Sequence, residues 1–166
     1  MNAALARNTP ARPVAFLAFD FGTRRVGVAA GNSLLKNAQP LATVSAQGEA
    51  RFEAIARLVR EWQPDALVVG VPFHPDGAAH DNTRRARAFG RQLHGRFKLP
   101  VHEVDERYST TEARAQGAAA AGGTAGIDAA SAAIILEQFL RSLPDSESDK
   151  SNENDQNHDK DADARA

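Results

Sequence analysis

Four acidic residues lie at positions where a carboxylate can take part in catalysis or bind a metal, and not only at solvent-exposed positions. Asp20 closes a run of six apolar residues, Asp105 and Glu106 end the last predicted strand, and Asp128 opens an apolar helical pattern. Carboxylates at strand ends and on a core-facing helix turn can converge, and they repel one another unless a divalent cation lies between them. Hard oxygen donors in a chain without Cys predict Mg²⁺ or Mn²⁺ and not zinc.

The periodicity around these acids predicts which way they point. Side chains alternate along a strand, so Asp20 should share a face with Phe16. Steps of four and three from Asp128 give a mainly apolar stripe, so Asp128 should face the sheet. Alternation puts Asp105 and Glu106 on opposite faces without deciding which of them joins the others. Both therefore remain candidate catalytic acids.

Such an acidic cluster is typical of enzymes that hydrolyse phosphodiester bonds with two bound metals about 3.5–4 Å apart. Asp20 and Asp128 are predicted metal ligands, and Glu106, or Asp105 in its place, completes the set. Each acid also has a simpler explanation. Asp20 could cap the turn that follows it, Asp128 could stabilise a helix N-terminus, and either member of the pair could bind Arg107.

The elements that would position these acids are strands and helices in alternation. Continuous apolar runs predict buried strands, and three- and four-residue spacing predicts helices. The predicted strands are 14–20, 25–30, 41–44, 66–71 and 100–104, and the predicted helices are 48–63, 82–97, 109–117 and 127–143. On the first helix, Phe52 and Ile55 should face the core, and Arg51 and Arg57 should face solvent. This order predicts an α/β domain with a mixed sheet flanked by helices.

Length and composition exclude several classes of protein. The 166 residues suit one compact domain. Without Cys, a disulfide scaffold and a thiolate metal site are excluded. No apolar run approaches the ~20 residues that span a bilayer. The N-terminal residues include no apolar signal segment, so we expect a cytoplasmic protein with no membrane partner.

The formal net charge of −1 hides an asymmetry along the chain. Residues 145–166 hold eight acids and three bases, whereas residues 1–144 carry a net +4. The acidic end has no large apolar residue and cannot offset the entropy of ordering. We therefore predict a flexible lead over 1–13, a folded domain over 14–143 and a disordered acidic tail over 144–166.

Five arginines are candidates for contacts with nucleic-acid phosphates. Arg24 and Arg25 lie in the turn after the first strand, and Arg107 adjoins the acidic pair. Arg84 and Arg85 begin the densest basic stretch, on the helix 82–97. The polar face of an ordinary amphipathic helix explains that stretch equally well.

Four segments resemble, in order, the motifs of the YqgF (RuvX) family of ribonuclease-H-like proteins. They are Asp20–Ala29 (DFGTRRVGVA), Val69–Pro72 with Asp76–Gly77, Asp105–Ala113 (DERYSTTEA) and Ile127–Leu136 (IDAASAAIIL). The match covers about residues 14–143, and four motifs in order are far more specific than one.

The resemblance implies a ribonuclease-H-like fold with a five-stranded mixed sheet. The family is described as Holliday-junction resolvases and as nucleases that mature the 5′ end of pre-16S ribosomal RNA. It therefore implies a metal-dependent nuclease that acts on structured ribosomal RNA precursors or on branched DNA. The ribosome or its assembly intermediates would be partners, and the enzyme would be a monomer or a weak homodimer. Asp20, the Asp105–Glu106 pair and Asp128 occupy the catalytic positions.

Two other functions fit parts of the sequence. An Asp-x-Gly-Thr hairpin also opens sugar-kinase and actin-like ATPases, but these need two such domains, and about 130 residues supply one. A non-catalytic assembly factor that binds ribosomal RNA gains nothing from carboxylates clustered near phosphate. The segment 116–126 is uncharged, whereas the corresponding loop of the family is often basic. Contacts with nucleic acid should therefore come from other residues.

Overall fold

The computed structural model describes residues 13–108 and 124–144. Four predicted features fall wholly or mainly outside these residues. They are the N-terminal lead, the helix 109–117, the loop 118–126 and the acidic tail.

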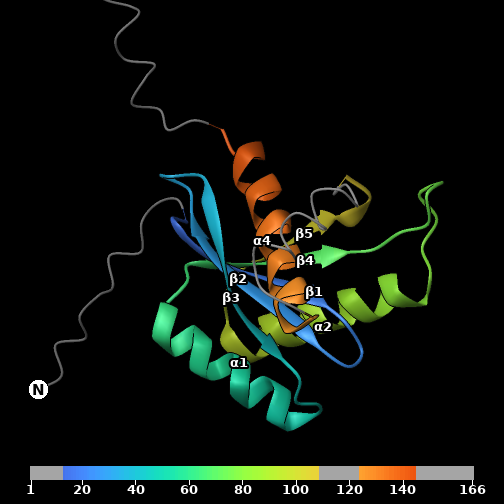
Figure 1. The fold of residues 1–166 in the computed structure, drawn as a ribbon, viewed down its shortest axis with the longest axis horizontal. Coiled ribbons are helices and arrows are strands. Elements are labelled where there is room, and N and C mark those ends of the chain that lie inside the picture. Colours follow the sequence, from blue (N-terminus) through green and yellow to red (C-terminus); the bar gives the residue numbers. More distant parts are fainter. Residues whose placement is uncertain (1–12, 109–123, 145–166) are drawn as a thin grey trace, which may run out of the picture.

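Strands and helices alternate as the sequence predicts. The strands are β1 (Ala15–Phe21), β2 (Val26–Asn32), β3 (Asn37–Val44), β4 (Ala66–Val71) and β5 (Val101–Asp105), and the helices are α1 (Glu49–Trp62), α2 (Asp81–Phe97), the 3₁₀ helix η1 (Glu106–Tyr108) and α4 (Thr124–Ser142). The sheet order is β3-β2-β1-β4-β5, with β1, β2 and β3 antiparallel and with β4 and β5 parallel to β1 (Figure 1). The predicted single α/β domain with a five-stranded mixed sheet flanked by helices is confirmed.

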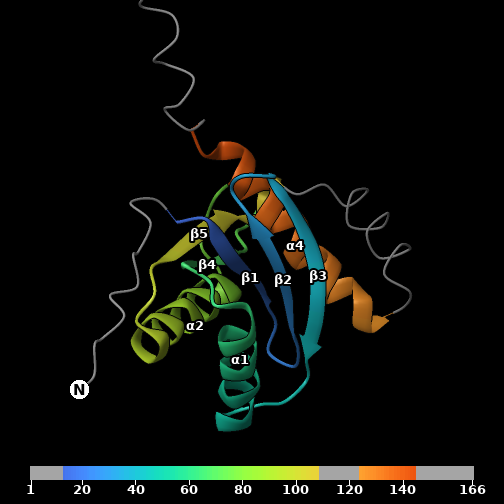
Figure 2. The same ribbon diagram turned by 90° about the vertical axis from the view of Figure 1, so that its left-hand side faces the viewer.

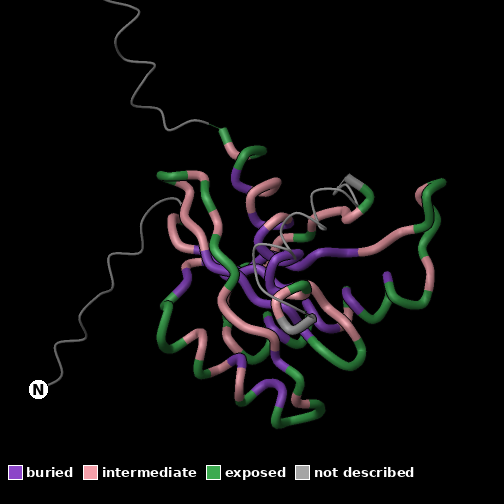
Figure 3. Tube along the Cα trace, viewed as in Figure 1, coloured by how far each residue is buried: buried purple, intermediate pink, exposed green. Residues whose placement is uncertain are grey.

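The helices cover both faces of the sheet. α1 and α2 lie on one face, and α4 crosses the other (Figures 1 and 2). Figure 3 shows that the buried residues run along the central strands, whereas the outward turns of α1 and α2 are exposed. The strands that carry the predicted acids are therefore held from both sides.

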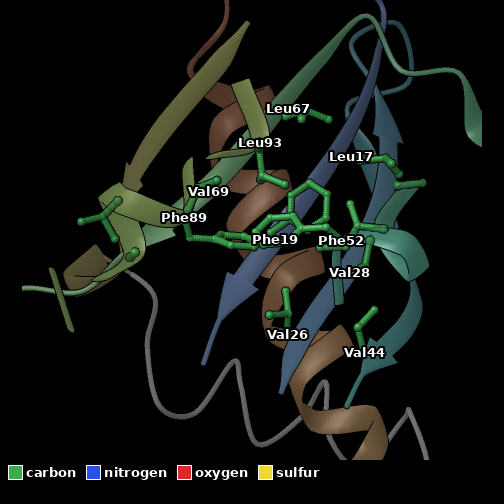
Figure 4. Packing of buried hydrophobic residues seen from close by; sticks show 14 residues of the cluster. Leu17, Phe19, Val26, Val28, Val44, Phe52, Leu67, Val69, Phe89 and Leu93 are labelled. Carbon is green, nitrogen blue, oxygen red and sulfur yellow. The ribbon is translucent and has the colours of Figure 1, made fainter. Parts of the chain in front are cut away.

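The core under α1 and α2 is built around aromatic rings. Phe89 of α2 has its ring centroid 5.9 Å from that of Phe19 and 6.0 Å from that of Phe52 (Figure 4). The core under α4 contains Phe16 and Ile135, both with at most 3% of their surface exposed. Burying one such side chain contributes about 1.5–3 kcal/mol, so each face strongly fixes the register of the sheet.

The structure corrects two predicted boundaries. β3 begins at Asn37 and not at Leu41, and it runs through Pro40. Only an edge strand tolerates this proline, and its pairing with β2 shifts between Val28 and Ala29. Polar residues in the first half of β3 hide the strand from a periodicity argument.

The second corrected boundary belongs to α4. This helix begins at Thr124, and so Asp128 lies in its second turn and not at its start. The expectation that Asp128 only complements a helix N-terminus therefore loses its geometric basis. None of the helices in residues 13–108 and 124–144 combines the length and apolar character needed to cross a membrane.

Candidate functional site

Asp20 lies in the middle strand of the sheet with a glycine on either side. Its Cα partner in β2 is Gly27, and its Cα partner in β4 is Gly70. Paired residues of neighbouring strands project on the same face, so all three share the face that α4 covers. Phe16 and Ala18 also pack on that face, as alternation predicts. Neither glycine adds a side chain beside Asp20, so atoms from other elements can approach the sheet there.

The glycine on the β2 side lets α4 approach the sheet closely. A Cβ atom added to Gly27 would lie 1.8 Å from the backbone oxygen of Asp128. The second turn of α4 therefore rests directly on the strand next to Asp20. Ala132 and Ile135, which share its stripe, are buried, and this confirms that Asp128 is on the sheet-facing side of the helix.

The glycine on the β4 side receives Glu106. A Cβ atom added to Gly70 would lie 2.7 Å from Oε1 of Glu106 and 2.5 Å from Cδ1 of Ile135. Asp105 pairs with Val71, so its side chain projects on the opposite face, towards α2. Of the two adjacent acids, Glu106 is thus the one that shares a face with Asp20 and Asp128.

The donor set suits a hard cation, although the carboxylates are not gathered into a coordination shell. Within residues 13–108 and 124–144, no three His, Asp or Glu side chains lie close enough to hold a metal ion. The three acids on the α4 face are nevertheless all carboxylates. Oδ2 of Asp128 is also buried, and its partner among the described residues is the ion-paired guanidinium of Arg25, without hydrogen-bond geometry. Such oxygens are the ligands that Mg²⁺ and Mn²⁺ prefer.

Of the five predicted phosphate-binding arginines, Arg25 contacts one of these acids, and Arg24 is its neighbour in the same turn. Arg25 and Arg24 are exposed in the β1–β2 turn. Nε of Arg25 lies 3.2 Å from Oδ2 of Asp128, and 45% of the Arg25 side chain is exposed. The pair joins the turn after Asp20 to α4 and brings a positive charge to the rim of the acid cluster.

The other three predicted arginines are placed differently. Arg84 and Arg85 are exposed on α2, which covers the opposite face of the sheet, and Arg84 pairs with Asp81 at 3.1 Å. Arg107 is bound to Asp105 with an Nη2–Oδ2 distance of 2.7 Å. Hydrogen bonds from the Arg107 side chain hold the pKa of Asp105 below its usual range. Asp105 is thus an ionised, structurally engaged carboxylate.

Arg51 is a residue of this region that the sequence argument placed wrongly. It was expected on the solvent side of α1, but only 7% of it is exposed. Its Nη2 donates to the carbonyl oxygen of Thr23 and its Nε to that of Ala46, both at 3.0 Å. Burial lowers the pKa of its guanidinium. Arg51 stands four residues before the buried Ile55, and this spacing was the available signal.

We expect replacement of Arg51 by Met to destabilise the fold and the β1–β2 turn. The loss of charge-assisted hydrogen bonds to Thr23 and Ala46 should lower the free energy of unfolding by about 2 kcal/mol. Urea denaturation followed by circular dichroism measures this change. Arg57→Met is the matched control, because Arg57 is exposed on the same helix, and it should stay within about 0.5 kcal/mol of the parent. Equal stabilities for the two variants would contradict a bracing role for Arg51.

Comparisons with known proteins match most of this chain to one family. The RuvX family model, described as "Holliday junction resolvase", matches residues 14–142. A "Putative pre-16S rRNA nuclease" of Polaromonas sp. is 68% identical over 129 residues, which cover 78% of this chain and 89% of that one. A protein of the same name from Paraburkholderia phytofirmans is 55% identical over 135 residues, covering 81% and 92%.

A solved structure of RuvC from Thermus thermophilus aligns with 76% of this chain and 93% of its own. The sequence identity is 14% and the TM-score is 0.49. The family assignment rests instead on the RuvX model and on the two relatives, each of which covers more than two thirds of the chain. The chain belongs to the RuvX family.

Proposed function

We propose that this protein is a divalent-metal-dependent nuclease that hydrolyses phosphodiester bonds during 5′-end maturation of pre-16S ribosomal RNA. The observation that carries the proposal is the position of Asp20 between Gly27 and Gly70, with Asp128 seated on one glycine and Glu106 on the other. Relatives with 55–68% identity are named for this activity.

Each acid has a distinct part in the proposed site. Asp20 projects from the rigid centre of the sheet, Asp128 comes from α4, and Glu106 comes from the turn after β5. Together they would hold Mg²⁺ or Mn²⁺. Asp105 faces the other side of the sheet and is bonded to Arg107, which supports leaving it out of the proposed set. When bound, the metal supplies an activated water and stabilises the leaving oxygen.

The proposed substrate is a structured ribosomal RNA precursor, held by its backbone. Arg24 and Arg25 are exposed in the turn after β1, where Arg25 pairs with Asp128, and both carry donors suited to phosphate oxygens. Arg84 and Arg85 lie on the far side of the sheet, so they would contact only a substrate that extends around the domain, such as a ribosomal assembly intermediate.

A Holliday-junction resolvase is the second candidate, because the matching family model carries that description. A resolvase cuts two strands symmetrically and therefore needs two copies of the site, which favours a homodimer. A nuclease that trims an RNA end needs one site. Substrate preference and oligomeric state together separate the two.

The test is to incubate the purified protein with a pre-16S ribosomal RNA fragment and, separately, with a four-way DNA junction. Each reaction is run with Mg²⁺ or Mn²⁺ and with a chelator. We expect cleavage of the RNA that the chelator removes and that Asp20→Asn lacks, with the junction cut more slowly or not at all. Glu103→Gln is the matched control, since Glu103 is an exposed acid on the opposite face of β5, and it should cut like the parent.

Three outcomes would contradict the proposal in different ways. Preferential cutting of the junction would favour the resolvase. Cutting by Asp20→Asn at the parental rate would place the chemistry elsewhere. Tight, salt-sensitive binding of the RNA without cleavage in any metal would favour a non-catalytic assembly factor.

A further inference from the structure

Five side chains form a continuous row on the α2 side of β5, which we call the β5 row. Its members are Glu103, Arg87, Phe73, Arg107 and Asp105. Glu103 and Asp105 are two residues apart on the strand and pair with Val69 and Val71, so they project on the face of the sheet opposite Asp20. The row therefore runs behind the acid cluster and not through it.

One end of the row is a tightly bonded ion pair. Oδ1 of Asp105 accepts the backbone N–H of Arg107 at 2.9 Å, and Oδ2 accepts from Nε at 2.9 Å and from Nη2 at 2.7 Å. Only 21% of the Asp105 side chain and 32% of the Arg107 side chain are exposed. Bidentate geometry makes such a pair stronger than an ordinary surface pair.

The middle of the row joins η1 to the loop between β4 and α2. The Phe73 ring has the guanidinium carbon of Arg107 5.6 Å from its centroid and that of Arg87 at 5.2 Å. Nε of Arg87 is in turn 3.3 Å from Oε2 of Glu103. Cation–π contacts of this kind hold the loop residue Phe73 between two arginines.

The same arginine packs against the tip of that loop. Gly77 has φ +90°, and a Cβ atom placed on it would lie 2.9 Å from Nη1 of Arg107. The tip is closed by its own hydrogen bonds, from His74 N–H to the Ala78 carbonyl at 2.9 Å and from Gly77 N–H to the His74 carbonyl at 2.8 Å. The guanidinium of Arg107 is thus enclosed by Asp105, Phe73 and Gly77.

We infer that Asp105 and Arg107 are positioning residues, which clamp the turn carrying Glu106 to the loop of residues 72–80 and so fix Glu106 over Gly70. The two clamp residues flank Glu106 in sequence, and their side chains are bonded on the face opposite its own. Holding both neighbours fixes the backbone from which the Glu106 side chain projects. This inference rests on the proposed function and assigns Asp105 and Arg107 roles different from those of a catalytic acid and a phosphate ligand.

The expected size of the effect follows from the sensitivity of catalysis to small displacements. A shift of about 1 Å in a catalytic group lowers the rate about 100-fold, even when the change is made elsewhere. A phosphate contact behaves differently, because its loss weakens binding and lowers the slope of log affinity against log salt by about 1. Rate, affinity and salt slope therefore separate a clamp from a phosphate ligand.

The experiment compares Asp105→Asn and Arg107→Lys with the parent, and it uses Glu103→Gln as the matched control. Glu103 pairs with an arginine in the same row but does not adjoin Glu106. We expect kcat for the ribosomal RNA fragment to fall about 10- to 100-fold in both clamp variants, with KM and the salt slope unchanged. Hydrogen exchange at the amides of His74 and Gly77 should accelerate, because the clamp that restrains their loop is loosened. The control should keep the parental kcat.

Two results would overturn the inference. Unchanged kcat and unchanged amide exchange in both variants would show that the pair positions nothing. Weaker RNA binding with a reduced salt slope in Arg107→Lys, at parental kcat, would make Arg107 a phosphate ligand. Failure of the proposed function is recognised separately. In that case the parent cleaves neither substrate, while the exchange at His74 and Gly77 still reports whether the clamp exists.

Discussion

Replacement of Gly27 by Ala should unfold or severely destabilise the domain. The new Cβ atom would lie 1.8 Å from the backbone oxygen of Asp128 and 2.8 Å from the backbone nitrogen of Ala129. These are main-chain atoms, so no side-chain rotation relieves the clash, and α4 must move away from β2. α4 buries Ile135 and Leu140 against the sheet, so the displacement should cost about 3 kcal/mol or more. Chemical denaturation measures this loss.

Gly95→Ala is the matched control for this prediction. Gly95 lies in α2, and a Cβ atom on it meets nothing within 4 Å. Alanine favours helix over glycine by about 1 kcal/mol, so this variant should be as stable as the parent or more so. A Gly27→Ala protein with parental stability would mean that α4 does not rest on β2 as described, and the position of Asp128 would have to be reconsidered.

The faces of the acids could be predicted where a regular element carries them. Asp20 lies near the end of a buried strand and Asp128 lies on a periodic helix, so period-two and period-3.6 patterns indicate the correct side for both. The same argument stops at Asp105 and Glu106. The strand ends at Asp105 and a 3₁₀ turn follows, and only the pairing of Val71 with Asp105 decides which acid faces Asp20.

Other features of the site depend on contacts between distant parts of the chain. Nothing local shows that residue 20 lies between Gly27 and Gly70, although a glycine inside a strand is a general sign of close approach. From the sequence, Arg51 is predicted to face solvent because charged side chains are rarely buried. Its burial becomes acceptable only when the carbonyl groups of Thr23 and Ala46 are brought to it. Sequence patterns thus predict the layers of this fold better than the partners of its polar groups.

The glycine on the other side of Asp20 should affect activity and not folding. An alanine Cβ at Gly70 would lie 2.5 Å from Cδ1 of Ile135 and 2.7 Å from Oε1 of Glu106. Both atoms end flexible side chains, which can turn aside, so Gly70→Ala should lower the free energy of unfolding by only about 1 kcal/mol. The main effect should be displacement of the Glu106 carboxylate by the new Cβ atom. Misplacing Glu106 by about 1 Å should lower the cleavage rate of the ribosomal RNA fragment about 100-fold.

A control and a double variant make this prediction specific. Gly90→Ala places a methyl group 3.5 Å from Val101 and 3.8 Å from Val69, which is ordinary contact on the opposite face of the sheet, so it should leave the cleavage rate unchanged. Adding Ile135→Val to Gly70→Ala removes the nearest clashing methyl group but still displaces Glu106. The double variant should therefore remain about 100-fold slow. Recovery of the rate would show that the pressure of Ile135, and not the space beside Asp20, limits activity. A stability loss in Gly27→Ala together with a rate loss in Gly70→Ala would distinguish a catalytic site from a coincidence of acids on one face.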